Sequence, residues 1–165
     1  MPNISTTTAS SAADKRPYTR EASRTRRHVA VKKTYVGSCH CGRVSFELQA
    51  SLTYVVYCNC SLCRRVGALW HGASDSSLRI SRGEGDLALY GFNTKTAKHY
   101  FCRHCGIHPF TRPRLDPTRW AVNVRCIAEV DLNSLEVKPF DGENWEVAAA
   151  KLRATPAARP GGNTA

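Results

Sequence analysis

Three cysteines lie within six positions of one another near the middle of the chain: Cys58, Cys60 and Cys63. Three thiols this close are too crowded for an ordinary disulfide framework, and they are one short of the four sulfurs that close a structural zinc site. A zinc ion held by three protein thiolates keeps an open coordination position. Because three thiolates leave such a site with a net negative formal charge, it activates water poorly and favours another soft sulfur ligand. The cluster therefore indicates thiol chemistry.

Four other cysteines form two short-range pairs, Cys39 with Cys41 and Cys102 with Cys105. Tetrahedral zinc places its sulfurs roughly 3.8 Å apart, which two converging pairs can satisfy. On an extended segment the side chains of Cys39 and Cys41 point to the same side, and in a Cys-x-x-Cys-Gly turn Gly106 accepts the backbone angle that the turn needs. The four cysteines predict a closed structural zinc site that joins the start of the domain to a late hairpin.

Several side chains close to these thiols have two interpretations each. Cys126 continues the apolar face of a predicted strand, so it is either a small buried hydrophobic residue or a further ligand. Trp70 and His71 follow the triplet and could wall a pocket, although Trp70 could equally belong to the core. Four histidines could be ligands or proton carriers, or could simply occupy variable positions around the cysteines: His40, His99, His104 and His108.

The hydrophobic pattern predicts short strands that position these motifs. Val44, Phe46 and Leu48 alternate with polar residues, which is the period of a half-buried strand. Further strands are expected over 53–57, 78–81, 87–92 and 120–127, and one strand is expected on each side of the Cys102–Cys105 turn. A short helix is expected over 61–66. Short strands with few helices predict an all-β domain, mainly antiparallel.

The two ends of the chain differ from its middle. Residues 1–34 are rich in Ser, Thr, Ala and Arg and residues 148–165 in Ala, Pro, Arg and Gly, so both are expected to be disordered around one domain over 35–147. Of the net charge of +11, residues 1–35 supply +6 and the rest +5. Such a basic arm could attract nucleic acid or a small anionic substrate.

Composition also limits where the protein works. No apolar run is long enough for a membrane helix and the N-terminus lacks the apolar stretch of a secretory signal, so we expect a soluble protein with no membrane partner. Eight cysteines in a reducing compartment favour metal binding over disulfides. The cytoplasm is the expected compartment. Mitochondria are the alternative, because the arm is poor in acidic residues.

Four strings of the sequence resemble, in order and spacing, the glutathione-dependent formaldehyde-activating enzymes and centromere protein V. They are Gly-Ser-Cys-His-Cys-Gly-Arg-Val (37–44), Cys-Asn-Cys-Ser-Leu-Cys-Arg-Arg-Val-Gly (58–67), Tyr-Phe-Cys-Arg-His-Cys-Gly-Ile-His-Pro-Phe (100–110) and Val-Asn-Val-Arg-Cys-Ile (122–127). The resemblance covers about residues 35–145 and implies a β-tent type fold. It also implies two zinc ions, a structural one on Cys39, Cys41, Cys102 and Cys105 and a second one on Cys58, Cys60 and Cys63.

The resemblance further implies a carbon–sulfur lyase that forms or cleaves S-hydroxymethylglutathione, the adduct of glutathione and formaldehyde. The glutathione thiol would bind at the open zinc position, next to the aldehyde carbon. Because glutathione is anionic, a positive rim is expected, supplied by Arg64 and Arg65 after the triplet or by Arg125, which shares a predicted strand face with Asn123. The alternatives are solvated arginines and an Asn123 that only hydrogen-bonds to a loop.

Other functions are compatible with the same motifs. The likeness to centromere protein V and the basic arm allow a zinc-stabilised module that binds nucleic acid or chromatin, although the folded part lacks a concentrated basic helix. The formaldehyde adduct also forms without an enzyme, so a non-catalytic glutathione carrier is a further alternative. The last alternative is a purely structural scaffold with two zinc ions, in which Cys126 or another side chain supplies the fourth ligand of the second site.

Overall fold

The computed structural model describes residues 31–155, and its regular structure consists mainly of short β-strands. The strands are β1 Lys33–Ser38, β2 Ser45–Ala50, β3 Tyr54–Cys58, β4 Trp70–Ala73, β5 Leu78–Arg82, β6 Leu87–Tyr90, β7 Lys98–Cys102, β8 Phe110–Arg112, β9 Trp120–Asn123 and β10 Glu136–Phe140. The helices are α1 Cys63–Val66 and α2 Trp145–Ala154, with four 3-10 turns, η1 Asp75–Ser77, η2 Glu84–Asp86, η3 Val124–Cys126 and η4 Leu132–Ser134. The predicted all-β fold class is confirmed.

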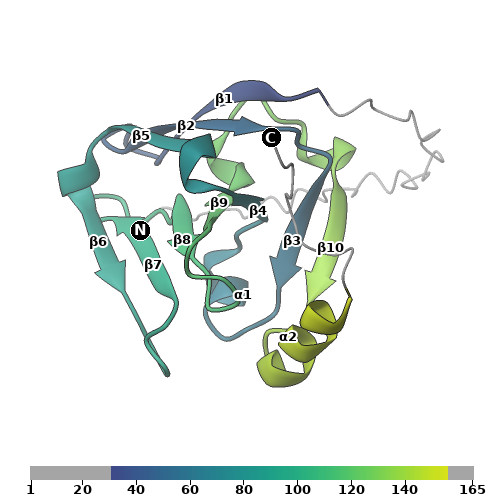
Figure 1. Ribbon diagram of the computed structural model, residues 1–165. Coiled ribbons are helices and arrows are strands. Elements are labelled where there is room, and N and C mark those ends of the chain that lie inside the picture. The colour runs from purple at the N-terminus through teal and green to yellow at the C-terminus, as the bar shows by residue number, and fades with distance from the viewer. Residues whose placement is uncertain (1–30, 156–165) are drawn as a thin grey trace, which may run out of the picture.

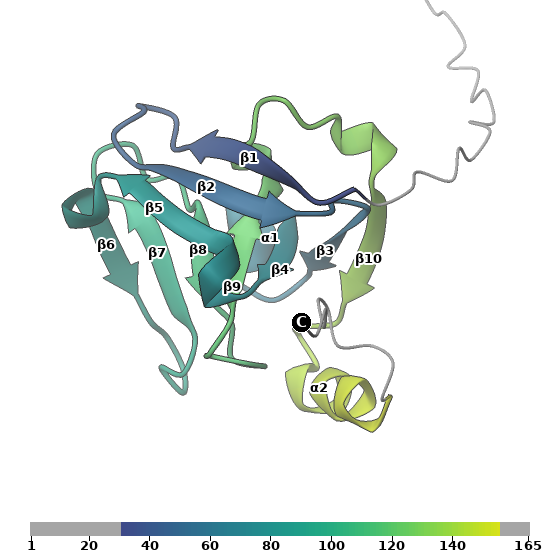
Figure 2. The ribbon, with the colours of Figure 1, turned by 45° about the horizontal axis from the view of Figure 1, so that its top comes forward.

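The strands form two sheets. The smaller sheet has the order β1-β2-β5 and the larger one the order β10-β3-β4-β9-β8-β7-β6. Neighbouring strands are antiparallel except β10, which pairs in parallel with β3. The smaller sheet lies across the upper end of the larger one in Figure 1, and Figure 2 shows the same arrangement from a tilted view. The fold is therefore two mainly antiparallel layers.

The main core lies between the two sheets. Phe46 of β2 and Phe110 of β8 are completely buried, and their rings meet edge to face with centroids 5.9 Å apart. Burying each aromatic side chain contributes about 1.5–3 kcal/mol. Gly37 pairs with Phe46 across β1 and β2, and a Cβ at Gly37 would overlap the Phe46 ring. The small sheet therefore needs glycine at this position in order to pack.

A smaller cluster lies near the start of β4. Cys63, Ala68 and Trp70 are buried together, and Cys58, Cys60 and Ala121 are among the residues that pack against them. The short helix α1 ends where expected, because Gly67 adopts a left-handed conformation with φ of 67°. The middle cysteine triplet is thus part of a packed cluster of its own.

The structure corrects several boundaries of the predicted elements. The strand predicted over 87–92 ends at Tyr90, and β1 begins at Lys33, inside the arm predicted over 1–34. The strand predicted over 120–127 ends at Asn123, whose side chain accepts a hydrogen bond from the Arg125 backbone N–H and starts the turn η3. Asn123 and Arg125 therefore do not share a strand face. The tail predicted to be disordered from 148 begins inside helix α2, which runs to Ala154. Residues 156–165, like residues 1–30 of the predicted arm, lie outside the described residues.

Tertiary contacts explain the helix in the predicted tail. The Arg114 guanidinium lies 3.7 Å from the centre of the Trp145 ring. The same guanidinium forms an ion pair of 2.6 Å with Glu146. Both partners belong to the first turn of α2, so a loop residue 32 positions before Glu146 stabilises the helix. Over residues 31–155, no helix is long and apolar enough to cross a membrane.

Candidate metal centres

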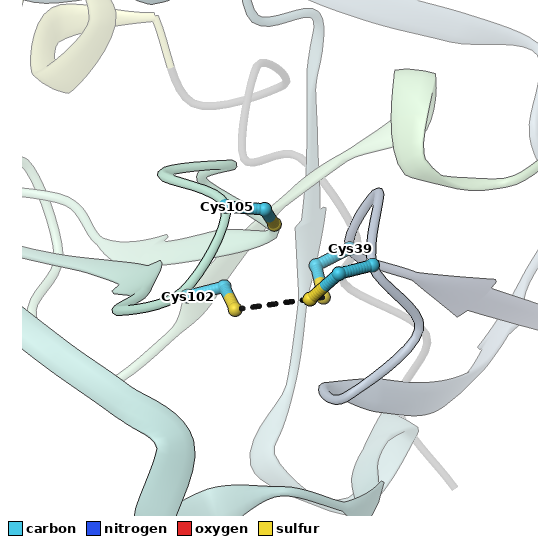
Figure 3. Close-up of side chains that lie close together, drawn as sticks. Cys39, Cys102 and Cys105 are labelled. Carbon is cyan, nitrogen blue, oxygen red and sulfur yellow. Dashed lines mark hydrogen bonds between the residues drawn. The ribbon is translucent and has the colours of Figure 1, made fainter.

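Two turns bring together four cysteines from distant parts of the chain, Cys39, Cys41, Cys102 and Cys105, which we call the four-cysteine site. Their Sγ atoms all lie within 4.8 Å of one another, with 3.6 Å from Cys39 to Cys41 and 3.7 Å from Cys41 to Cys102. Figure 3 shows the sulfurs of Cys39, Cys102 and Cys105 directed toward a common centre. These separations match the roughly 3.8 Å edge of a tetrahedral zinc–thiolate site. The four residues can hold one metal ion.

The backbone of the four-cysteine site is built from two tight turns. Gly106 N–H donates to the Cys102 carbonyl at 2.8 Å, and Gly106 has a positive φ of 73°, as the Cys-x-x-Cys-Gly motif predicts. Cys39 and Cys41 do not converge on an extended segment as predicted. Strand β1 ends at Ser38, and a turn closed by a bond from Gly42 N–H to the Cys39 carbonyl at 3.0 Å brings the two sulfurs together.

The second cluster, which we call the three-cysteine site, consists of Cys58, Cys60 and Cys63. Cys58 is the last residue of β3 and Cys63 the first of α1, and the three Sγ atoms lie within 4.8 Å of one another. The Cys63 backbone N–H donates to the Cys60 sulfur at 3.4 Å, a contact that favours a thiolate. Over the described residues, no fourth metal-ligating side chain joins this group.

A loop from the far end of the domain fixes the three-cysteine site. Strand β10 pairs with β3, and Phe140 lies opposite Cys58. Beyond this pair, the Asn59 side-chain amide donates to the Asp141 carboxylate at 3.0 Å and accepts from the Glu143 backbone N–H at 3.0 Å. The loop Cys58–Asn59–Cys60 is thus hydrogen-bonded to residues 140–143, about 80 positions later in the chain.

Gly142 lies directly against the three-cysteine site, and no sequence motif predicts this contact. A Cβ at Gly142 would lie 2.5 Å from the Cys58 sulfur and 2.8 Å from the Cys60 Cβ. Real side chains do not tolerate such distances, so the cysteine loop would have to move. Only a residue without a side chain lets the 140–143 loop approach the sulfurs this closely.

We expect Gly142→Ala to weaken metal binding at the three-cysteine site and leave the fold intact. The added methyl group displaces Cys58 and Cys60, and misplacing supports of metal ligands typically reduces affinity about 10- to 100-fold. Competition with a chromophoric chelator measures this affinity. The matched control is Gly85→Ala, because a Cβ at Gly85 meets no atom within 4 Å. Equal affinities in the two variants would contradict the assignment of Gly142 as a support.

The three thiols are so close that they cannot all ionise without a cation. Hydrogen bonds from the Cys58 thiol, then from the Cys63 thiol, lower the pKa of Cys60 to about 2. The hydrogen bond with Cys60 raises the pKa of Cys58, and the hydrogen bonds with Cys58 and then with Cys60 raise the pKa of Cys63, because a thiol that donates such a bond keeps its proton. A divalent cation at the centre removes this conflict, since it stabilises all three thiolates together. The donor set therefore fits a soft or borderline metal ion such as zinc.

The four polar residues predicted around the substrate occupy different settings. Arg64 and Arg65 extend from α1, where Arg64 forms an exposed ion pair of 3.4 Å with Glu143 and Arg65 donates to the Ser61 carbonyl. Arg125 is exposed in η3. Asn123 is buried, and its side chain accepts from the Leu69 and Arg125 backbones and donates to the His108 carbonyl. Asn123 thus has the structural hydrogen-bonding role considered as the alternative.

The remaining cysteine and the histidines lie outside both clusters. Cys126 packs against the main core, where burial, and then the charges of Cys39 and Cys105, raise its pKa to about 12. It therefore lies beside the four-cysteine site and does not complete the three-cysteine site. Neither cluster includes a histidine among the described residues. His104 instead pairs with Asp86 at 2.7 Å.

The fold and the two clusters define a two-layer β protein with two cysteine sites able to bind metal ions. All eight cysteines are free thiols. The family model of the glutathione-dependent formaldehyde-activating enzyme matches residues 34–145, and the chain belongs to this family. Membership implies a small-molecule substrate related to glutathione.

A solved structure is also similar to this chain. It is the crystal structure of a Rhodobacter sphaeroides protein that was a structural-genomics target, and it shares 39% sequence identity with a TM-score of 0.57. The match covers 62% of this chain and 99% of the other. The match of the family model over residues 34–145 confirms the resemblance inferred from the cysteine motifs for the formaldehyde-activating family.

Proposed function

We propose that the three-cysteine site holds zinc and binds the thiol of glutathione, and that the protein forms or cleaves S-hydroxymethylglutathione as a carbon–sulfur lyase. One observation carries this proposal. The three sulfurs converge within 4.8 Å, and among residues 31–155 no fourth metal-ligating side chain joins them. A tetrahedral ion held there would have one position left for a ligand. The four-cysteine site, with all four ligands supplied by the chain, would hold the structural zinc.

The proposed reaction needs little more than a thiolate held next to an aldehyde. In the forward direction a carbon–sulfur bond forms between the glutathione sulfur and the formaldehyde carbon, and the thiol proton ends on the former carbonyl oxygen as a hydroxyl group. The reverse direction breaks the same bond and returns the proton to sulfur. When bound, zinc would supply a position for the sulfur and lower the pKa of its thiol.

The chain's own residues would position the ligand. Cys58, Cys60 and Cys63 fix the location of the reacting sulfur, and the Asn59–Asp141 hydrogen bond holds two of them in place. We propose that Arg64, Arg65 and Arg125 attract the carboxylates of glutathione. Arg64 and Arg65 directly follow Cys63 in the sequence, and Asn123 would act indirectly by holding the Leu69 and Arg125 backbones.

Three measurements on protein purified without chelator test this proposal. Elemental analysis should give two zinc ions per chain, one for each cysteine site, and calorimetry should detect glutathione binding. Exchange NMR with labelled formaldehyde then measures the interconversion rate, since the adduct also forms without an enzyme. The expected result is faster exchange with the protein present. Two zinc ions and glutathione binding without acceleration would indicate a glutathione carrier instead, and one zinc ion without glutathione binding would contradict the proposed site.

A further inference from the structure

His99 presents a buried nitrogen without a partner. The residue lies in β7 and is only 7% exposed. Its Nε2 is the one buried side-chain nitrogen or oxygen without a hydrogen-bond partner among the residues that the structure describes. Buried polar atoms in native proteins are nearly always hydrogen-bonded, because leaving one unpaired costs about 1–3 kcal/mol. A buried atom of this kind points to a group that binds there.

The neighbours of His99 decide what Nε2 can bind. The Thr111 hydroxyl has one proton, which it donates to the Lys98 carbonyl at 2.8 Å, so its oxygen accepts from His99 Nδ1 at 3.1 Å. The proton of the neutral ring is then on Nδ1, and Nε2 carries a lone pair. Burial, and then the nearby His108, lower the pKa of His99, although the charge of Cys60 opposes them. His99 is therefore a neutral hydrogen-bond acceptor at neutral pH.

The sheet register places His99 on the same face as the three-cysteine site. His99 pairs with Thr111 across β7 and β8, and Thr111 pairs with Ala121 across β8 and β9. Directly paired residues of a sheet point to the same side. Ala121 packs against the cluster that contains Cys63, Trp70, Cys58 and Cys60. A continuous row of side chains thus connects the imidazole to the cysteines.

The residues that follow His99 in this row are small and leave room for a ligand to lie along this face of the sheet. Between His99 and the cysteine cluster stand Thr111 and Ala121, and the next paired position, on β4, is Gly72. Because neighbouring strands are about 4.8 Å apart, the two strand steps from His99 on β7 to Ala121 on β9, which packs against the cysteine cluster, span roughly 10 Å. This span suits a small peptide thiol in extended form.

We propose that His99 Nε2 accepts a hydrogen bond from an N–H group in the peptide part of the thiol ligand whose sulfur occupies the three-cysteine site. The inference rests on the proposed function, because it requires a thiol at that site. In addition to the proposed function, it assigns to His99 the preference for a thiol that carries a peptide N–H group over a thiol without one. The ring stacks on Phe92 with centroids 5.7 Å apart, so its orientation is fixed before a ligand arrives.

Two substitutions at His99 separate the acceptor from the rest of the ring. His99→Gln places an amide oxygen near the position of Nε2, whereas His99→Asn places its polar atoms only near Nδ1. The zinc-loaded proteins are titrated calorimetrically with glutathione and with 3-mercaptopropionate, which has no N–H group. We expect His99→Asn to weaken glutathione binding about five- to tenfold, the value of one neutral hydrogen bond. His99→Gln should bind within about twofold of the natural protein, and neither variant should change mercaptopropionate binding.

The outcomes separate this inference from the proposed function. If the natural protein binds neither thiol, the thiol site itself is wrong. If it binds glutathione and His99→Asn binds equally well, or if His99→Asn loses both thiols alike, the role of His99 is wrong while the thiol site stands. NMR of the natural protein gives an independent test, because the Nε2 resonance of His99 should move upfield when glutathione is added. An unchanged resonance would overturn the inference even if a variant fails to fold.

Discussion

Replacing Cys102 with serine is expected to unfold the domain. Cys102 is completely buried in the main core and supplies one of four sulfurs to the four-cysteine site. Structural zinc binding contributes about 10–16 kcal/mol in zinc-finger peptides, whereas a whole domain is stable by about 5–15 kcal/mol. The loss of a large part of the zinc-binding free energy is therefore greater than the free energy of unfolding of the whole domain. Circular dichroism should show no cooperative melting transition, and zinc analysis little bound metal.

Two companion variants identify the cause of this unfolding. Cys41 belongs to the same site but is exposed, so Cys41→Ser removes a ligand without removing core packing, and it should unfold the domain as Cys102→Ser does. Cys126→Ser removes a thiol beside the site without removing a ligand and should retain both metal ions. A Cys41→Ser protein that melts like the natural one would show that packing, not metal, explains the Cys102 result.

The cysteine clusters could be predicted because their information is local. Spacings such as Cys58, Cys60 and Cys63 limit where the sulfurs can lie, and the turn at Gly106 needs only its own residues. The alternation at Phe46 and Leu48 likewise predicts β2 because one face of the strand is buried. Neighbouring residues determine the geometry at Gly106 and in β2, so the sequence predicts both correctly. The Cys39–Cys41 turn is the local exception, because the i, i+2 spacing predicted an extended segment there.

The missed features depend on contacts between distant residues. Strand β10 is exposed at four of its five positions, so it has no apolar alternation, and it forms because its backbone pairs with β3. Gly142 follows that strand and contacts Cys58 only through this pairing. Helix α2 likewise depends on the contact of Arg114 with Trp145. In each of these pairs the two partners are far apart in the sequence. Composition and periodicity, which describe neighbouring residues, therefore could not predict the contacts.

The turn at Arg125 shows the same limit on a smaller scale. Alternation through residue 127 predicted a continuous strand, but the buried Asn123 side chain accepts the Arg125 and Leu69 backbone N–H groups. A side chain that replaces a strand hydrogen bond ends the strand. The sequence pattern shows which residues are apolar. It does not show which backbone groups the Asn123 side chain binds, so it could not predict the end of the strand.

Replacing Cys58 with serine is expected to abolish the proposed activity while the domain stays folded. Cys58 is partly exposed and lies outside the main core, and the four-cysteine site remains complete. Zinc content should fall from two ions per chain to one. Glutathione binding should disappear, and the exchange of labelled formaldehyde should return to the uncatalysed rate. The melting temperature should fall by only a few degrees, since 1 kcal/mol shifts it by about 4 °C in a domain of this size.

Comparison of Cys58→Ser with Cys102→Ser tests the division of the two sites into a structural and a reactive one. If both variants unfold, the three-cysteine site is structural as well, and an open coordination position has no role. If Cys58→Ser stays folded but keeps two zinc ions and full glutathione binding, the thiol binds elsewhere. Gly142→Ala provides the intermediate case, because it leaves all three sulfurs in the chain and changes only their placement. A partial loss of zinc affinity and of exchange rate in that variant, between those of the natural protein and Cys58→Ser, would tie the activity to the geometry of the three sulfurs.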